Sequence, residues 1–268
     1  FLVAFVVTLV ATPIMRRLAL ANGVIDRPSE ARKQHRLPVA YLGGAAVFLG
    51  LAAGVMFSYV ALGIAGLCDF HVTRHLPDGA NPMPVPLSVL LGMSVIALVG
   101  LIDDVTGISP RVKIGGQLFA AAALAIDDVG VKVAEGVLTP IGALIGNSSL
   151  TWVIPLPFLG PLIGTEHLEL DLIYWAGTAI IAMFVLGACN ASNLIDGLDG
   201  LLTGVTGIAA MGLLVLALGL ALVDDGPRDA QRIVLCMALL GACLGLLPHN
   251  FNPATLFLGD CGPLLLGY

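Results

Sequence analysis

The sequence predicts an all-α, polytopic integral membrane protein, and three observations lead to this fold class. Hydrophobic residues make up 58% of the 268 positions, and the mean hydropathy is +0.99. Only 11% of the residues are charged, against about 25% in a typical soluble domain. Apolar runs of helix length recur along the whole chain, and its 33 glycines suit the close packing of helices in lipid.

The apolar runs predict the elements in order, because about 20 helical residues cross the hydrocarbon core of a bilayer. The first run is too long and continuous for the apolar part of a signal peptide. The fourth opens at Gly115 and Gly116 and closes at Asp127 and Asp128, an acidic pair that we assign to a solvated helix end. We expect seven spans and the start of an eighth, over residues 1–19, 43–66, 86–102, 114–130, 172–189, 201–223, 231–247 and from 261 onward.

The remaining segments complete the predicted organisation. The longest stretch between spans, 131–171, contains β-branched residues and prolines and predicts a small hairpin or re-entrant piece on the non-cytoplasmic side. No second soluble domain is visible, so residues 1–268 are expected to form a single transmembrane domain. The chain begins at Phe1 without a methionine and ends at Tyr268 within an apolar run, so we expect both ends to be truncated.

The basic residues predict the orientation, since cytoplasmic loops are enriched in Lys and Arg. Eight of the twelve lie in or beside loops 20–42 and 103–113, and four lie at the opposite ends of the spans. The same parity puts loops 190–200 and 248–262 in the cytoplasm, as parts of a multi-pass plasma-membrane protein. A net charge of −6, with the basic residues mostly in one loop, does not indicate nucleic-acid binding.

Carboxylates follow several of the apolar runs on this one side. Each ionised carboxylate near a bilayer is costly, by about 2.5–3.5 kcal/mol at a helix centre and less at the interface. Their clustering therefore predicts a shared polar site for a divalent cation and a phosphate-bearing ligand. The basic loop adds Lys33 and His35, which either contact an anionic phosphate or belong to a segment that sets topology beside anionic lipid.

The pair Asp103 and Asp104 ends the third span, where adjacent carboxylates repel unless they share a cation or a proton. One could ligate Mg²⁺ while the other orients or deprotonates a nucleophile, and the alternative is an acidic cap at a helix end. Lys113 and Gln117, one helical turn apart, could add a phosphate contact.

The loop at 190–200 carries polar residues at every third position, namely Asn190, Asn193, Asp196 and Asp199. Two glycines within it break an ordinary helix, so the pattern predicts a turn or 3₁₀-like segment that presents amide and carboxylate groups along a strip. Such groups bind a sugar, a base edge, or a metal and its water ligands.

The last loop carries Asn252, Phe257 and Asp260. Phe257 could stack on a flat base, and the alternative is that Phe251 and Phe257 are both interfacial anchors. Asp260 lies between glycines, which leaves room for a metal or a phosphate to approach.

With these motifs in this order, the chain resembles the polyprenyl-phosphate N-acetylhexosamine-1-phosphate transferases, integral membrane enzymes that include relatives of the phospho-MurNAc-pentapeptide translocase. The resemblance covers nearly the whole chain. It implies Mg²⁺-dependent transfer of a sugar 1-phosphate from a UDP-sugar to undecaprenyl phosphate, with release of UMP. Mn²⁺ is a possible substitute for Mg²⁺, and a homodimer is a possible assembly.

The resemblance also implies roles for individual residues. Asp260 and Asp104 would hold the metal, and Asp103, Asp104 and Asp199 would form the catalytic group, with Asp103 as the base or the orienter of the lipid phosphate. Phe257 would stack on uracil. The remaining substrate contacts would come from Asn190, Asn193, Asp196, Asn252, Lys113, Lys33 and His35.

The string from Asn193 to Gly200 looks more like the branch that uses UDP-GlcNAc and begins envelope polysaccharides such as lipopolysaccharide or teichoic acid. The chain departs from the family where Ala40 and Tyr41 replace a Pro-Arg pair before the double glycine. The family's later His-rich motif belongs to a fifth cytoplasmic loop, and the chain stops in the eighth span, before that loop. The alternatives are the phospho-MurNAc-pentapeptide transferase of peptidoglycan synthesis, an ion-coupled transporter, and an inactive scaffold.

Overall fold

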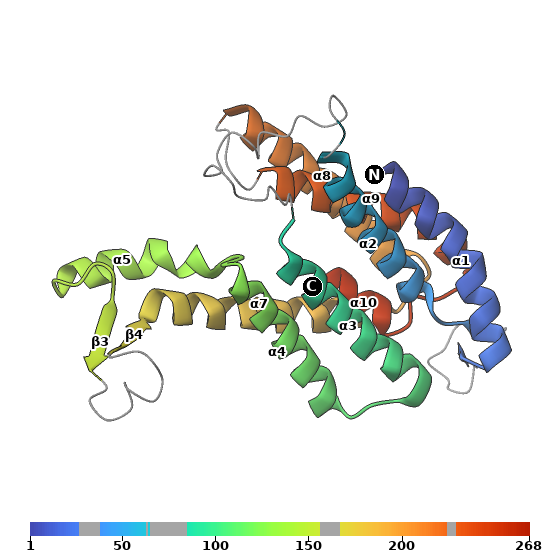
Figure 1. Cartoon of the computed structure of the whole chain (residues 1–268). Coiled ribbons are helices and arrows are strands. Elements are labelled where there is room, and N and C mark those ends of the chain that lie inside the picture. Colours follow the sequence, from blue (N-terminus) through green and yellow to red (C-terminus); the bar gives the residue numbers. More distant parts are fainter. Residues whose placement is uncertain (27–37, 63, 65–84, 156–166, 224–228) are drawn as a thin grey trace.

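A computed structural model describes residues 1–26, 38–62, 64, 85–155, 167–223 and 229–268. The described part is built almost entirely of helices, with two short β-ladders (Figure 1). The helices are α1 (Leu2–Asn22), α2 (Gly43–Leu62), α3 (Leu87–Thr106), α4 (Pro110–Ile126), the 3₁₀ turn η2 (Val131–Ala134), α5 (Glu135–Leu144), α7 (Leu172–Ile195), α8 (Leu201–Val223), α9 (Asp229–Asn250) and α10 (Cys261–Gly267). The strands are β1 (Ile25–Asp26), β2 (Val39–Ala40), β3 (Thr151–Pro155) and β4 (His167–Asp171).

The predicted all-α polytopic fold is confirmed. Within the described residues, six helices are long and apolar enough to cross a membrane, namely α1, α2, α3, α7, α8 and α9. The fourth expected span is not straight: α4 and the η2–α5 segment form a pair bent by 85°, and counting that pair as one span gives seven. Asp128 and Gly130 lie at the bend with φ of 53° and 76°, backbone conformations that interrupt a right-handed helix.

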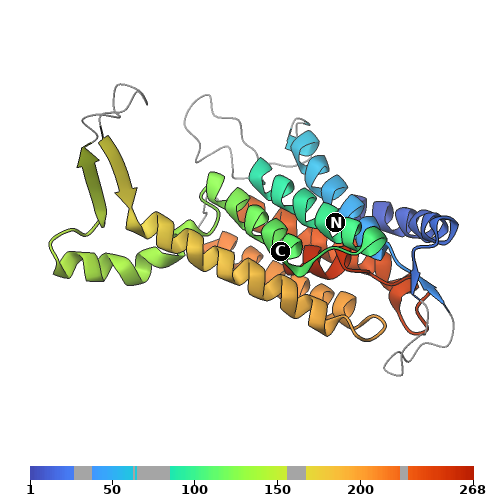
Figure 2. The ribbon, with the colours of Figure 1, turned by 90° about the horizontal axis from the view of Figure 1, so that it is seen from below.

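The helices pack in two neighbouring groups, and contacts of α2 and α10 connect the groups. Helices α1, α2 and α9 lie against one another, α8 packs on α9, and α3 packs on α4 (Figures 1 and 2). The short helix α10 lies between α2, α3 and α7. Small residues make the closest approaches possible: a Cβ at Gly50 would lie 1.8 Å from Thr8 Oγ1, and one at Gly245 would lie 2.6 Å from the carbonyl oxygen of Phe5.

Large apolar side chains remain exposed along the candidate spans. Leu91, Phe184 and Val215 are examples, at 44%, 67% and 67% exposure. Such faces are hydrophobic without a protein partner in the described structure, which is the pattern expected of helices that face lipid.

The hairpin expected within 131–171 is present. Strands β3 and β4 pair antiparallel, with Thr151 opposite Asp171, and β4 leads directly into α7. Asp171 caps that helix by accepting a hydrogen bond from the backbone N–H of Tyr174 at 3.0 Å. Figures 1 and 2 show the hairpin and α5 together at one end of the molecule, beside the start of α7.

Candidate active site

The ends of several helices and two connecting segments surround one polar pocket with a volume of about 700 Å³. Its walls come from parts of the chain that are more than 200 residues apart in sequence. Six aspartates contribute to it. The lining residues are Asp26, Tyr41, Asp103, Asp104, Asn193, Asp196, Gly197, Leu198, Asp199, Asn250, Asn252, Phe257, Gly259 and Asp260.

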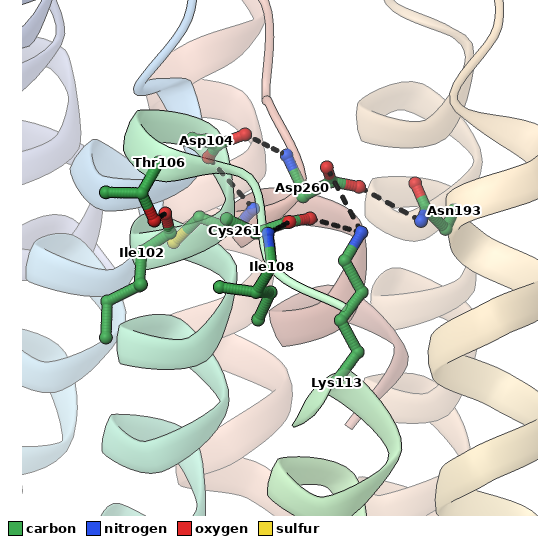
Figure 3. A network of polar contacts seen from close by, with 9 residues as sticks. Ile102, Asp104, Thr106, Ile108, Lys113, Asn193, Asp260 and Cys261 are labelled. Carbon is green, nitrogen blue, oxygen red and sulfur yellow. Dashed lines mark hydrogen bonds and ion pairs between the residues drawn. The ribbon is translucent and has the colours of Figure 1, made fainter. Parts of the chain in front are cut away.

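Asp103, in the last turn of α3, is held on both carboxylate oxygens. Oδ1 accepts a hydrogen bond from the backbone N–H of Ile108 at 2.7 Å, and Oδ2 forms an ion pair with Lys113. The ammonium of Lys113, from the first turn of α4, also lies 3.3 Å from Oδ2 of Asp260. The ammonium thus contacts both carboxylates, a position that favours a cation, and Figure 3 shows it beside the carboxylate of Asp260.

Asp104 faces a different partner. Its Oδ1 accepts a hydrogen bond from the backbone N–H of Asp260 at 2.6 Å, and its Oδ2 accepts one from Cys261 at 3.1 Å (Figure 3). Those are N–H groups at the beginning of α10, which have no partner inside the helix. Asp104 therefore positions the segment that carries Asp260, and the adjacent carboxylates of the pair have separate tasks.

Gly259 makes the contact with Asp104 possible. Its φ is 69°, and an added Cβ would lie 2.5 Å from Oδ2 of Asp104. Neighbouring glycines admit the same segment between α2 and α3: a Cβ at Gly44 would lie 2.1 Å from the nitrogen of Gly262, and one at Gly100 would lie 2.4 Å from Cα of Cys261. Close packing of backbone on backbone thus determines where Asp260 lies.

The segment 190–200 differs in part from the predicted turn. Helix α7 continues through Ile195, so Asn190 and Asn193 are helical, and the turn begins at Asp196. Nδ2 of Asn193 donates a hydrogen bond to Oδ1 of Asp260 at 3.0 Å. The carboxylate of Asp199 accepts hydrogen bonds from Nδ2 of Asn252 at 3.2 Å and from the backbone N–H of Ala254 at 2.9 Å, which joins the third and fourth motifs.

The structure does not bring every predicted residue to the pocket wall. Nδ2 of Asn190 donates to Oε1 of Gln117 at 3.0 Å, a contact between α7 and α4 outside the residues that line the pocket. Gln117 is fully buried rather than open to a phosphate. Lys113 reaches the site through its two ion pairs. Lys33 and His35 lie outside the described residues.

Asp26 and Tyr41 are among the lining residues that the sequence did not indicate as site residues. Asp26 immediately precedes the basic loop, and Tyr41 precedes the double glycine, so their place beside recognised motifs was the available signal. The ring of Tyr41 lies 6.2 Å from that of Phe257, centroid to centroid, at an angle of 46°.

Two carboxyl groups of the pocket, those of Asp196 and Asp260, have raised pKa values. Burial, with repulsion from Asp260 and Asp199, raises the pKa of Asp196 to about 7. Burial and the hydrogen bond that it shares with Asp103 raise the pKa of Asp260. Each shift means that an additional positive charge would be favoured in the pocket.

These residues fit a magnesium ion by the chemistry of their donors. Mg²⁺ prefers oxygen ligands and is typically held by one or two carboxylates together with waters and substrate phosphates. Among the residues that the structure describes, no three His, Cys, Asp or Glu side chains are already grouped as a metal site. A site with few protein ligands, completed by a phosphorylated substrate, agrees with both observations.

The fold and the pocket define a polytopic membrane protein with an aspartate-rich site at the ends of its helices. The chain belongs to glycosyl transferase family 4, whose family model matches residues 86–268. This confirms the family expected from the motifs.

Several curated proteins are similar to the chain. A probable undecaprenyl-phosphate N-acetylglucosaminyl 1-phosphate transferase of Bacillus subtilis is 30% identical over 100% of this chain and 59% of its own length. A decaprenyl-phosphate N-acetylglucosaminephosphotransferase of Mycobacterium tuberculosis is 33% identical over 99% of this chain and 56% of its own. A phospho-N-acetylmuramoyl-pentapeptide-transferase of Desulforudis audaxviator is 31% identical over 99% of this chain and 71% of its own. The chain thus spans less than two thirds of the length of the first two.

Proposed function

We propose that this protein transfers a sugar 1-phosphate, most simply GlcNAc 1-phosphate, from a UDP-sugar to a polyprenyl phosphate in the plasma membrane and releases UMP. The observation that carries the proposal is the gathering of six aspartates in one pocket beside the ends of α3 and α7, with Lys113 paired to two of them. A phosphorylated lipid in the bilayer and a water-soluble nucleotide sugar can meet at such a site. The names of the similar proteins support the same reaction.

The reaction is a displacement at phosphorus. An oxygen of the lipid phosphate forms a bond to the phosphorus that carries the sugar oxygen, and the bond from that phosphorus to the bridging oxygen breaks. UMP leaves with the bridging oxygen and the electron pair of the broken bond. A phosphate monoester has a second pKa of about 6, so most of the acceptor is dianionic at neutral pH and needs little help from a base.

In this proposal Asp260 and Asp196 are the carboxylates that would hold Mg²⁺. When bound, the ion would neutralise charge on the diphosphate and on the departing UMP. Asn193 fixes Oδ1 of Asp260, and Asp104 fixes its backbone, so the carboxylate is oriented before substrate arrives.

Lys113 would contact phosphate oxygens, and Asp103 would hold its ammonium at the site. Both oxygens of Asp103 are already engaged, by Ile108 and Lys113, which supports an orienting role over proton abstraction. Asp199 would hold the last loop through Asn252 and Ala254.

We also propose that the pocket faces the cytoplasm, where UDP-sugars are available. The excess of basic residues in the loops on that side supports this orientation. An ion-coupled carrier is supported less well, because carrier sites typically lie near the bilayer midplane, whereas Asp103, Asp104 and Asp196 lie at the ends of α3 and α7.

UMP release by the full-length protein in detergent tests the proposal. The assay contains undecaprenyl phosphate, Mg²⁺, and either UDP-GlcNAc or UDP-MurNAc-pentapeptide. Lipid-dependent release with UDP-GlcNAc is the expected result, and release with the pentapeptide donor alone would move the protein to the second branch. Release with neither donor from folded protein would refute the transferase function.

Asp260→Asn should abolish release. Asp128→Asn is the matched control, because Asp128 lies outside the pocket and its φ of 53° is one that Asn readily adopts. Equal activity of Asp260→Asn and the control would remove Asp260 from the proposed site.

A further inference from the structure

The acidic pocket has one aromatic corner. The rings of Tyr41 and Phe257 both line the pocket, and their centroids lie 6.2 Å apart at 46°. Both side chains are only partly buried, so ring surface remains available to a ligand. At this separation and tilt the rings contact each other, which leaves no room for a third ring between them. A planar group would therefore stack on one ring and meet the other at its edge.

Three segments distant in sequence hold this corner together. The backbone N–H of Tyr41 donates to the carbonyl of Val24 at 3.1 Å, beside the β1–β2 ladder. The backbone N–H of Phe257 donates to the carbonyl of Ala40 at 2.8 Å, and the carbonyl of Phe257 accepts from Gly43 at 2.9 Å. Residues 40 to 43 thus lie hydrogen-bonded between β1 and the last loop, and both rings project from this small ladder.

Asp26 fixes the free end of Tyr41. The phenol hydroxyl donates a hydrogen bond to the carboxylate of Asp26, which is only 9% exposed. Burial and the charge of Asp26 raise the pKa of Tyr41, so the hydroxyl remains a donor at physiological pH. A tyrosine held at its backbone and at its hydroxyl loses little further freedom when a ligand binds.

The corner differs chemically from the rest of the pocket wall. Six of the fourteen residues that line the pocket are aspartates. Their negative charge repels the electron-rich face of a base, whereas an aromatic ring gives that face a surface on which to stack. A nucleotide has a charged end suited to cations near the aspartates and a planar end suited to rings. A pocket of about 700 Å³ is in the size range of small-molecule sites.

We propose that Tyr41, anchored by Asp26, is a positioning residue that works with Phe257 to bind the heterocyclic base of the nucleotide substrate. This inference rests on the proposed function and deepens it. Tyr41 contributes ring surface and fixes the orientation of the Phe257 ring, and it takes no part in the bond changes at phosphorus.

Calorimetric titration of the full-length protein in nanodiscs tests the inference, with Mg²⁺ and either UMP or inorganic pyrophosphate as the probe. Removing a stacking ring typically weakens binding of a base by about 5- to 150-fold. We expect Tyr41→Leu, which keeps side-chain bulk without a ring, to weaken UMP binding within that range and to leave pyrophosphate binding within about twofold. Tyr41→Phe, which restores the ring, should recover most of the UMP affinity.

Tyr174→Leu is the matched control. Tyr174 also belongs to an aromatic pair, with Trp175 at 5.7 Å, and its hydroxyl donates to the carbonyl of Ala125, but it lies outside the acidic pocket. In the transfer assay, Tyr41→Leu should raise KM for the UDP-sugar with a much smaller change in kcat, which a general loss of structure does not produce.

The outcomes separate the two proposals. Unchanged UMP affinity in Tyr41→Leu, or an equal loss for UMP and pyrophosphate, overturns the role of Tyr41 while the wild type still releases UMP. A wild type that binds neither UMP nor UDP-sugar overturns this inference together with the proposed function.

Discussion

Replacing Asp104 by Asn separates two roles that this residue could have. In the structure its carboxylate accepts hydrogen bonds from the backbone N–H groups of Asp260 and Cys261, at 2.6 and 3.1 Å. An amide has one acceptor oxygen, so its NH₂ group would face one of these donors. Hydrogen bonds to charged groups contribute about 1.5–3 kcal/mol each. We therefore expect Asp104→Asn to lower the free energy of unfolding by roughly 2–4 kcal/mol, from one lost bond and one weakened bond.

Thermal unfolding of the full-length protein in detergent, with and without Mg²⁺, measures this effect. If Asp104 positions Asp260 as the geometry indicates, the variant melts at a lower temperature without Mg²⁺ but still gains stability when Mg²⁺ is added. An unchanged melting temperature without Mg²⁺, combined with loss of the Mg²⁺-induced gain, would refute the reasoning and make Asp104 a direct metal ligand.

Gly259 supplies the matched second variant. Gly259→Ala places a Cβ 2.5 Å from Oδ2 of Asp104 at a residue with φ of 69°, and the backbone strain alone costs about 1–2 kcal/mol. Combining it with Asp104→Ala removes the steric contact, so the double variant should be less destabilised than the sum of the two single variants. Strict additivity would mean that the two residues do not share one interaction.

Three further predictions concern charge in the pocket. Lys113→Met leaves the carboxylates of Asp103 and Asp260 without their shared cation, so UMP release should fall by at least about 100-fold, the scale of one transition-state contact, while a Lys132→Met control retains activity. Chelation of divalent cations should abolish UMP release, and Mg²⁺ or Mn²⁺ should restore it; activity that persists in excess EDTA would contradict the metal role. Because the pKa of Asp196 is raised from 3.8 to about 7 on folding, its contribution to stability without metal is fully present below about pH 4 and is lost as the pH rises through 7. The melting temperature without Mg²⁺ should therefore decrease from pH 5 to pH 8, and Asp196→Asn should reduce that decrease; an identical pH profile in the variant would disprove it.

The sequence alone predicts much of the local structure, because local patterns encode it. Long apolar runs between polar loops indicate the spans, and the prolines and β-branched residues of 131–171 indicate the hairpin. The bend after α4 has a sequence signal in Asp127, Asp128 and Gly130, although the sequence was interpreted as one span over 114–130. The motifs also indicate the family, since their order along the chain needs no tertiary information.

The partners of each aspartate required the tertiary structure. Asp103 and Asp104 are chemically identical neighbours in the sequence, yet one pairs with Lys113 and the other holds the start of α10. Asn190 and Asn193 are the same residue type and belong to the same three-residue repeat. Asn190 lies almost one turn earlier on α7, so it contacts Gln117, whereas Asn193 contacts Asp260 in the pocket.

Only the packing of distant segments decided these roles. Asp104 and Asp260 are 156 residues apart, and they meet because Gly44 and Gly100 let the last loop approach α2 and α3 at backbone distance. Tyr41 and Asp26 also lie in the site because of contacts between separate segments. Backbone hydrogen bonds connect the segment at Val24 to residues 40–43 and these residues to Phe257. Hydropathy and motif spacing report on the structure of one helix or loop at a time. The role of a carboxylate depends instead on which hydrogen-bond donors the folded chain brings within about 3 Å of it.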